Sequence, residues 1–247
     1  MQENNFLSTK NIPVHDRLIF ALDVSGPEAA KQLVNQLGDS VSFYKLGLQL
    51  FMAGGYFELV RWLQDRGKKI FVDLKFFDVP QTVRSAVREL KKYGVSFATV
   101  HGNDSILRAA VEEKNGLGIL AVTVLTSLDQ ADMEDLGFRA DVRDVVLSRA
   151  RRALEIGCDG IVSSGLEAAD IRQELGDRLV IVTPGIRPVR NLDDQKRTVD
   201  VEEAFRNGAD YIVIGRPIRE PVDFATPREA AESIQERIRT LFEGQHP

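Results

Sequence analysis

Short apolar runs alternate with helix-like segments along almost the whole chain, and this alternation is the strongest constraint on its fold. Eight runs are rich in β-branched and aromatic residues, which is typical of strands. They predict strands at residues 17–24, 42–47, 68–77, 96–102, 118–125, 159–164, 179–185 and 210–216. The segments between them have apolar residues at helical spacing, as at residues 26–38, 82–94 and 227–242. Because a helix that joins two neighbouring strands makes them parallel, the pattern predicts a parallel sheet covered by helices.

A chain of 247 residues is long enough for eight such units, and no linker or change in composition divides them. We therefore predict a single (β/α)8 TIM barrel over residues 16–247, with the active site at the C-terminal ends of the strands. Residues 1–15 read as a polar N-terminal tail. An open doubly wound sheet is the alternative, but it normally carries a glycine-rich turn after the first strand. Residues 21–28, ALDVSGPE, contain one glycine.

Composition excludes several classes of partner. A net charge of −5 argues against nucleic acid, which binds basic surfaces. The single cysteine, Cys158, excludes an internal disulfide framework and a cysteine-based metal site, and it fits the reducing cytoplasm. No apolar run is long enough for a membrane span, and the N-terminus lacks the pattern of a signal peptide. We predict a cytoplasmic protein without a membrane partner.

Residues 71–80, FVDLKFFDVP, place Asp73, Lys75 and Asp78 inside an apolar run. Charges are costly to bury unless they are paired or used. On a regular strand Asp73 and Lys75 point to the same side, into the mouth of the barrel, and Asp78 follows where the chain turns. Lys45, on the preceding strand, extends this charged array. A structural salt-bridge network is the alternative to a catalytic site.

A phosphate site is predicted after the seventh and eighth strands, where many such barrels bind phosphate. Gly215 lets the backbone approach an anion, and Arg216 can bind phosphate oxygens in a bidentate manner. Arg187 is a second candidate, for which a solvated side chain is nearly as good an interpretation. The long segment 186–200 is typical of a lid, and Gln195 is its candidate ligand.

The remaining polar residues at strand ends are less specific. Asp23 ends the first strand and Thr126 follows the fifth. His101 ends the fourth strand and is either a general base or, more simply, a hydrogen-bonded structural residue. We find no metal-ligand cluster around it, and we interpret the acidic residues of 129–135 as solvated surface.

Seven motifs occur in order at these positions: ALDV, YKLG, DLKFFDVPQT, VTVLTS, TPGIRP, DQKR and VIGRP. Together they closely resemble the bacterial type of orotidine 5′-phosphate decarboxylase, over about residues 17–240. The D-x-K-x-x-D block followed by Pro and Thr is the most specific part. Val79 stands where that family often has Ile, and every catalytic position of the family is filled.

The resemblance implies decarboxylation of orotidine 5′-monophosphate to UMP, the last step of de novo pyrimidine synthesis, without a metal or an organic cofactor. It implies that Lys75 donates a proton to C6, that Asp73 lies near the departing carboxylate, and that Lys45 and Asp78 complete the array. The implied substrate ligands are Asp23 and Lys45 for the ribose, Thr126 for the pyrimidine, and Arg187, Gln195, Gly215 and Arg216 for the phosphate.

The resemblance also implies a homodimer, in which Asp78 and Thr82 reach the active site of the neighbouring subunit. The sequence leaves two alternatives open. One is a related sugar-phosphate decarboxylase, which shares D-x-K-x-x-D but depends on Mg²⁺. The other is a non-catalytic nucleotide sensor, which retains Arg216 and the lid but does not need Lys75.

Overall fold

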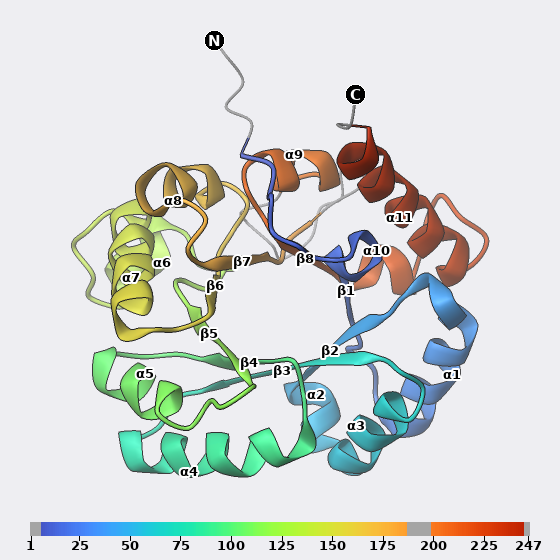
Figure 1. The fold of residues 1–247 in the computed structure, drawn as a ribbon, viewed down its shortest axis with the longest axis horizontal. Coiled ribbons are helices and arrows are strands. Elements are labelled where there is room, and N and C mark those ends of the chain that lie inside the picture. Colours follow the sequence, from blue (N-terminus) through green and yellow to red (C-terminus); the bar gives the residue numbers. More distant parts are fainter. Residues whose placement is uncertain (1–5, 187–198, 245–247) are drawn as a thin grey trace.

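The computed structural model describes residues 6–186 and 199–244, and its strands form a closed barrel in the order β1 to β8 (Figure 1). All neighbouring strands are parallel, and β8 pairs with β1 through Leu18 and Ile212. The predicted TIM barrel is therefore confirmed. The strands are β1 (Leu18–Ala21), β2 (Phe43–Gly47), β3 (Lys69–Phe76), β4 (Phe97–Val100), β5 (Gly118–Val122), β6 (Gly160–Val162), β7 (Val180–Thr183) and β8 (Tyr211–Ile214).

Helices surround the barrel and cover its outer face (Figure 1). The α-helices are α1 (Pro27–Leu37), α2 (Leu48–Met52), α3 (Tyr56–Gln64), α4 (Pro80–Leu90), α5 (Asp104–Val111), α6 (Gln130–Asp135), α7 (Val142–Ile156), α8 (Ala168–Leu175), α9 (Val201–Arg206), α10 (Arg216–Arg219) and α11 (Pro227–Glu243). Short 3₁₀ helices lie at Val14–Arg17, Gly38–Ser40 and Lys91–Tyr93. The described part of the chain contains no helix that is both long and apolar enough to cross a membrane.

Each strand presents alternate residues to the barrel interior and to the helices, as the two-residue period of a strand requires. Ile19 and Phe43 belong to the interior cluster, whereas Phe20 and Tyr44 pack in the outer layer. Aromatic rings fill much of the interior, and the ring centroids of Phe43 and Phe97 lie 5.6 Å apart. Because apolar side chains occupy the middle of the barrel, polar groups that point inward collect at its ends.

Strand β3 is irregular at its C-terminal end. Val72 pairs with Ala98 on β4, and the next pair is Phe76 with Val100, with a register shift between them. Three residues of β3 therefore lie opposite a single residue of β4, Thr99. The extra length is the signature of a β-bulge, a feature that often lies next to an active site.

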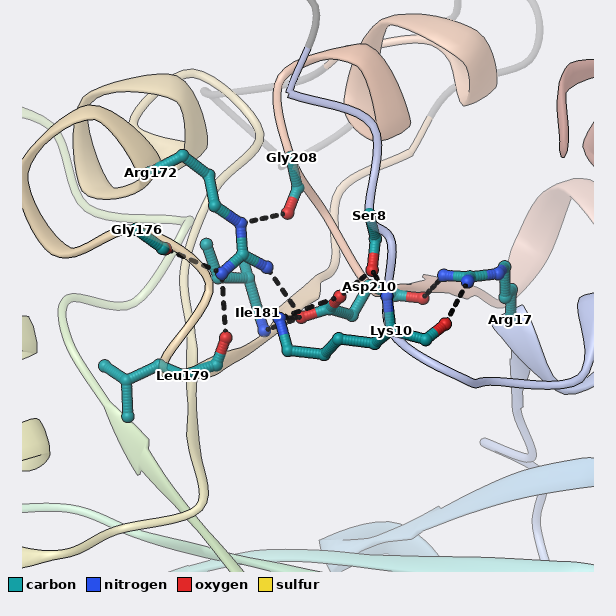
Figure 2. A network of polar contacts seen from close by, with 9 residues as sticks. All are labelled: Ser8, Lys10, Arg17, Arg172, Gly176, Leu179, Ile181, Gly208 and Asp210. Carbon is teal, nitrogen blue, oxygen red and sulfur yellow. Dashed lines mark hydrogen bonds and ion pairs between the residues drawn. The ribbon is translucent and has the colours of Figure 1, made fainter. Parts of the chain in front are cut away.

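The N-terminal end of the barrel is closed by a buried ionic network around Asp210, the residue before β8 (Figure 2). The Asp210 carboxylate is fully buried and accepts hydrogen bonds from Lys10 Nζ at 3.1 Å and Arg172 Nη2 at 2.6 Å. The Ser8 hydroxyl and the Ile181 backbone N–H also donate to it. The carboxylate is thus fully paired by protein groups.

Two arginines extend this network to the backbone (Figure 2). Arg172 donates to the carbonyl oxygens of Gly208 at 2.9 Å and Leu179 at 2.8 Å. Arg17 donates to the Asp210 and Lys10 carbonyls, both at 3.2 Å. Residues 8–10 are therefore tied to the barrel, while the domain boundary at residue 15 stays a prediction.

Candidate active site

A cavity of about 420 Å³ opens at the C-terminal end of the barrel. Seven of the residues predicted for the site from sequence line it: Asp23, Lys45, Asp73, Lys75, Thr126, Gly215 and Arg216. They come from the ends of β1, β2, β3 and β8 and from the segment after β5. Residues that are up to 193 positions apart thus face one space because the barrel gathers the strand ends there.

The charges in this cavity alternate in sign. Lys45 Nζ lies 3.2 Å from Asp23 Oδ1 and 3.5 Å from Asp73 Oδ2. Lys75 Nζ lies 2.9 Å from Asp73 Oδ1. Each ammonium group has at least one carboxylate partner, and Lys45 stands between two.

Burial and pairing act in opposite directions on these groups. Burial opposes the charge of Asp73, but the neighbouring Lys45 and Lys75 outweigh it and hold the pKa of Asp73 below its ordinary value. Burial likewise opposes the charge of Lys45, and the carboxylates of Asp73 and Asp23 outweigh it, so the pKa of Lys45 is raised. Both groups therefore stay ionised at neutral pH.

Lys75 differs from its neighbours in exposure. Its side chain is 34% exposed, compared with 12% for Lys45 and 14% for Asp73. The ammonium group therefore has one side bonded to Asp73 and another side open to the cavity. Such a group can stabilise negative charge that develops on a ligand atom and can then deliver a proton to it.

Thr99 is a site residue that the sequence reasoning missed. It is fully buried on β4. Its hydroxyl accepts a hydrogen bond from the Lys75 backbone N–H at 2.9 Å and donates one to Asp73 Oδ1 at 2.9 Å. Strand alternation places Thr99 two residues after the inward-facing Phe97, and this signal was present in the sequence.

Gly47 is a second missed residue. A Cβ atom at this position would lie 3.2 Å from Asp23 Oδ1 and 3.2 Å from Lys45 Nζ. The glycine of the YKLG motif therefore leaves the space in which the two charges meet. Gln49 and Arg219 also line the cavity, and Arg219 donates a hydrogen bond to the Asp23 carbonyl.

The predicted phosphate region lies on the β8 side of the same cavity. A Cβ atom on Gly215 would lie 3.3 Å from the Ala21 Cβ, so a side chain there would crowd β1. Arg216 begins α10, is exposed and lines the cavity. Arg187 and Gln195, and most of the predicted lid 186–200, lie outside the described residues.

Asp78 and Thr82 do not join the other predicted residues in this cavity. Both are exposed, and the Asp78 carboxylate accepts a hydrogen bond from the Val79 backbone N–H at 2.6 Å. Helix α4 begins at Pro80, two residues earlier than the sequence indicated, so Thr82 lies in its first turn. Both side chains are therefore free to face another molecule.

His101 lies beside the cavity rather than in it. Its ring centroid is 5.5 Å from that of Phe77, and burial, Arg149 and Lys75 together lower its pKa. The acidic residues after β5 have a structural task, because Asp129 and Asp132 form the capping box of α6. Across residues 6–186 and 199–244, no three His, Cys, Asp or Glu side chains are grouped as metal ligands.

The sequence matches a known family over most of its length. The model of the orotidine 5'-phosphate decarboxylase / HUMPS family matches residues 16–234. An orotidine 5'-phosphate decarboxylase from Methylococcus capsulatus is 64% identical over 240 residues, which cover 96% of this chain and 98% of the relative. One from Xanthomonas euvesicatoria is 49% identical over 94% of this chain and 95% of the relative.

Solved structures agree with this similarity. The crystal structure of orotidine 5'-phosphate decarboxylase from Lactobacillus acidophilus is similar with a TM-score of 0.78 and 33% identity, covering 90% of this chain and 98% of that one. The enzyme from Pyrococcus horikoshii is similar with a TM-score of 0.70 and 27% identity, covering 90% of this chain and 99% of that one.

Proposed function

The chain belongs to the orotidine 5'-phosphate decarboxylase / HUMPS family, and we propose that it converts orotidine 5′-monophosphate to UMP and CO₂ in the cytoplasm. This reaction is the last step of de novo pyrimidine synthesis. The observation that carries the proposal is the alternating array of Asp23, Lys45, Asp73 and Lys75, which shares one cavity with Arg216.

The chemistry explains why such an array is useful. Loss of CO₂ breaks the bond between C6 and the carboxyl carbon and leaves the electron pair in an sp² orbital at C6. No ring orbital can delocalise this pair, so the site has to stabilise it. The open side of the Lys75 ammonium group offers positive charge where the pair forms, and its proton then moves to C6.

Asp73 lies beside the departing carboxylate in this proposal. Repulsion alone does not explain catalysis, because one charge pair at 4 Å and an effective dielectric of 20 contributes about 4 kcal/mol. Enzymes lower barriers by roughly 8–23 kcal/mol. Stabilisation of the developing charge by Lys75 is therefore needed in addition, and the hydrogen bond from Lys75 to Asp73 holds the ammonium group in place until the proton moves.

Lys45 supports a reaction without a metal ion. Its ammonium group stands between Asp23 and Asp73, at 3.2 and 3.5 Å. A divalent ion that bound both carboxylates would have to displace it. Lys45 and Asp23 also present a donor and an acceptor to the ribose hydroxyls, and we assign Thr126, which lines the same cavity, to the pyrimidine.

The phosphate group of the substrate is distant from the reacting carbon and contributes binding energy. We assign it to Gly215 and Arg216, with Arg187 and Gln195 joining from the segment 186–200. Binding energy from this distant group can be used to organise the reacting end of the substrate and to close a lid over it.

The working unit in this proposal is a homodimer, with Asp78 and Thr82 contributed to the neighbouring active site. Exposed apolar side chains beside Asp78 support it, since Phe77 is 69% and Val79 62% exposed. More apolar surface is exposed after the adjacent strand β2, at Leu48, Phe51 and Met52. Surfaces of this kind commonly mark protein interfaces.

Ultraviolet absorbance of orotidine 5′-monophosphate mixed with the purified protein in EDTA tests the function. We expect the orotate band to disappear with the wild-type protein and to persist with Lys75→Ala. Turnover that EDTA abolishes would indicate the Mg²⁺-dependent decarboxylase instead. Tight binding of UMP by a folded wild-type protein without turnover would indicate the nucleotide sensor.

A further inference from the structure

Lys75 has a strained backbone. Among the residues that the structure describes, Lys75 is the only non-glycine residue with a positive φ, which is 48°. Such a conformation is unfavourable for a residue with a side chain and persists only where the surrounding structure imposes it. The strained residue is also the one to which we assign proton donation, so the group that imposes the strain is of functional interest.

Thr99 is bonded to the strained residue through its backbone. The Lys75 N–H can only donate, so the Thr99 oxygen accepts that bond, at 2.9 Å. A carboxylate can only accept, so the Thr99 hydroxyl proton is directed to Asp73 Oδ1, also at 2.9 Å. The partners on both sides therefore fix the orientation of the hydroxyl.

The same contacts form a closed ring. Lys75 Nζ donates to Asp73 Oδ1 at 2.9 Å, which is the oxygen that Thr99 also contacts. Thr99 thus links the backbone of Lys75 to the carboxylate that holds its ammonium group. It stands opposite the three residues of the β3 bulge, of which Asp73 is the first and Lys75 the last.

We infer that Thr99 is a positioning residue for the proposed decarboxylation. It holds Lys75 in its left-handed conformation and turns the Asp73 carboxylate toward Lys75 Nζ, without touching the substrate itself. The inference rests on the proposed function, and it assigns the task to the hydroxyl rather than to the bulk of the side chain.

Thr99→Val separates these two contributions, because valine keeps the shape and removes the hydroxyl. Small misplacements of a catalytic group can cost about 10²-fold in rate, so we expect kcat to fall by about 10- to 100-fold. The KM and the affinity for UMP should change much less, because the phosphate contacts lie across the cavity. Thr99→Ser keeps the hydroxyl and should recover most of the lost kcat.

Thr123→Val is the matched control. Thr123 is also buried, and its hydroxyl donates to the Val162 carbonyl at 2.9 Å rather than to a member of the charged array. We expect it to lower the thermal midpoint comparably while keeping the wild-type kcat. If Thr99→Val does not fold, Thr99→Ala provides the same comparison with Thr99→Ser.

The outcomes separate this inference from the proposed function. If the wild type does not decarboxylate orotidine 5′-monophosphate, the proposed function fails and the inference fails with it. If the wild type is active and Thr99→Val keeps its kcat, only the inference is overturned. It is also overturned if Thr99→Ser is as slow as Thr99→Val, because the hydroxyl would then not be the important group.

Discussion

Two carboxylates at opposite ends of the barrel, Asp73 and Asp210, are both held by basic side chains but in different surroundings. Asp210 is fully buried and receives donors from Ser8, Lys10, Arg172 and Ile181. Asp73 receives donors from Lys75 and Thr99, with Lys45 at 3.5 Å, and lines an open cavity. The first network is complete within the protein, whereas the second leaves charge facing the space for a ligand.

This difference predicts separate consequences of mutation. A complete buried network contributes to stability because removing one member leaves another charge buried and unpaired. An open array holds charges in place for a reaction, and removing one that is partly exposed costs little stability. Changes in the Asp210 network should therefore lower stability more than activity, and changes in the open array should lower activity more than stability.

The largest effect is expected for Lys75→Ala at the open end. We expect kcat/KM to fall by at least about 10³-fold, equivalent to roughly 4 kcal/mol, because the proton donor and its positive charge are lost. The thermal midpoint should stay near that of the wild type. Absorbance assays and thermal unfolding measure the two quantities. A variant that retains a tenth of the activity would show that Lys75 is not the donor.

Asp210→Asn tests the closed end. The change leaves the buried Arg172 without its carboxylate, so we expect a loss of about 3 kcal/mol in the free energy of unfolding. Activity per folded molecule should remain, since Asp210 does not line the active-site cavity. Urea unfolding with a parallel activity assay measures both. Unchanged stability would contradict a stabilising role for the Asp210 network.

Gly47→Ala should produce an intermediate effect at the open end. Its Cβ would lie 3.2 Å from both Asp23 Oδ1 and Lys45 Nζ, so these charged groups must give way by a few tenths of an ångström. We expect kcat/KM to fall by about 10-fold with little change in stability. Gly26→Ala is the matched control, because its Cβ would meet nothing within 4 Å. Equal activity of both variants would show that the absence of a side chain at Gly47 is not needed for activity.

The smallest effect concerns pH and stability. The pKa of Asp73 is below its ordinary value of 3.8, so its charge contributes stability above that pH. This contribution is lost as the pH falls through the folded-state pKa, when the carboxylate becomes protonated. The stability difference between wild type and Asp73→Asn should therefore be constant from pH 5 to 7 and change below about pH 3.8. Chemical unfolding at several pH values measures it, and a constant difference down to pH 2 would contradict the shift.

Lys45, in the same site, should give a pH dependence of stability in the opposite direction. Its pKa is raised above 10.5, so its contribution to stability is complete below that pH and is lost as the pH rises through the higher folded-state value. Asp73→Asn removes one of the two carboxylates that raise the pKa of Lys45. In this variant the loss of stability at alkaline pH should therefore begin at a lower pH.

The eight strands and the surrounding helices could be predicted because local patterns carry them. Residues 18–21 and 43–47, for example, lie within the predicted ranges 17–24 and 42–47. The convergence of Asp23, Lys45, Asp73, Lys75, Thr126, Gly215 and Arg216 followed from the barrel, which brings the ends of all strands to one side. Their roles in catalysis stay predictions.

The two-residue period of a strand predicts that Asp73 and Lys75 point to the same side. The structure also brings these two side chains together. However, they lie in a β-bulge, which the regular strand period does not predict. The positive φ of Lys75 has no local signal, since it depends on the bond to Thr99 across the sheet. The space beside Gly47 likewise depends on Asp23, which lies 24 residues away.

The sequence alone therefore determined the barrel, the end of the barrel that carries the charges, and the residues that meet there, because these follow from the period and order of the strands. The tertiary structure alone decided which of two ionic networks is closed and which is open. It also decided that Ser8 and Lys10 hold Asp210, about 200 residues later, and that Thr99 holds Lys75. Whether an ionic network is complete within the protein depends on how many donors reach its carboxylate. Those donors come from distant parts of the chain that no local pattern connects.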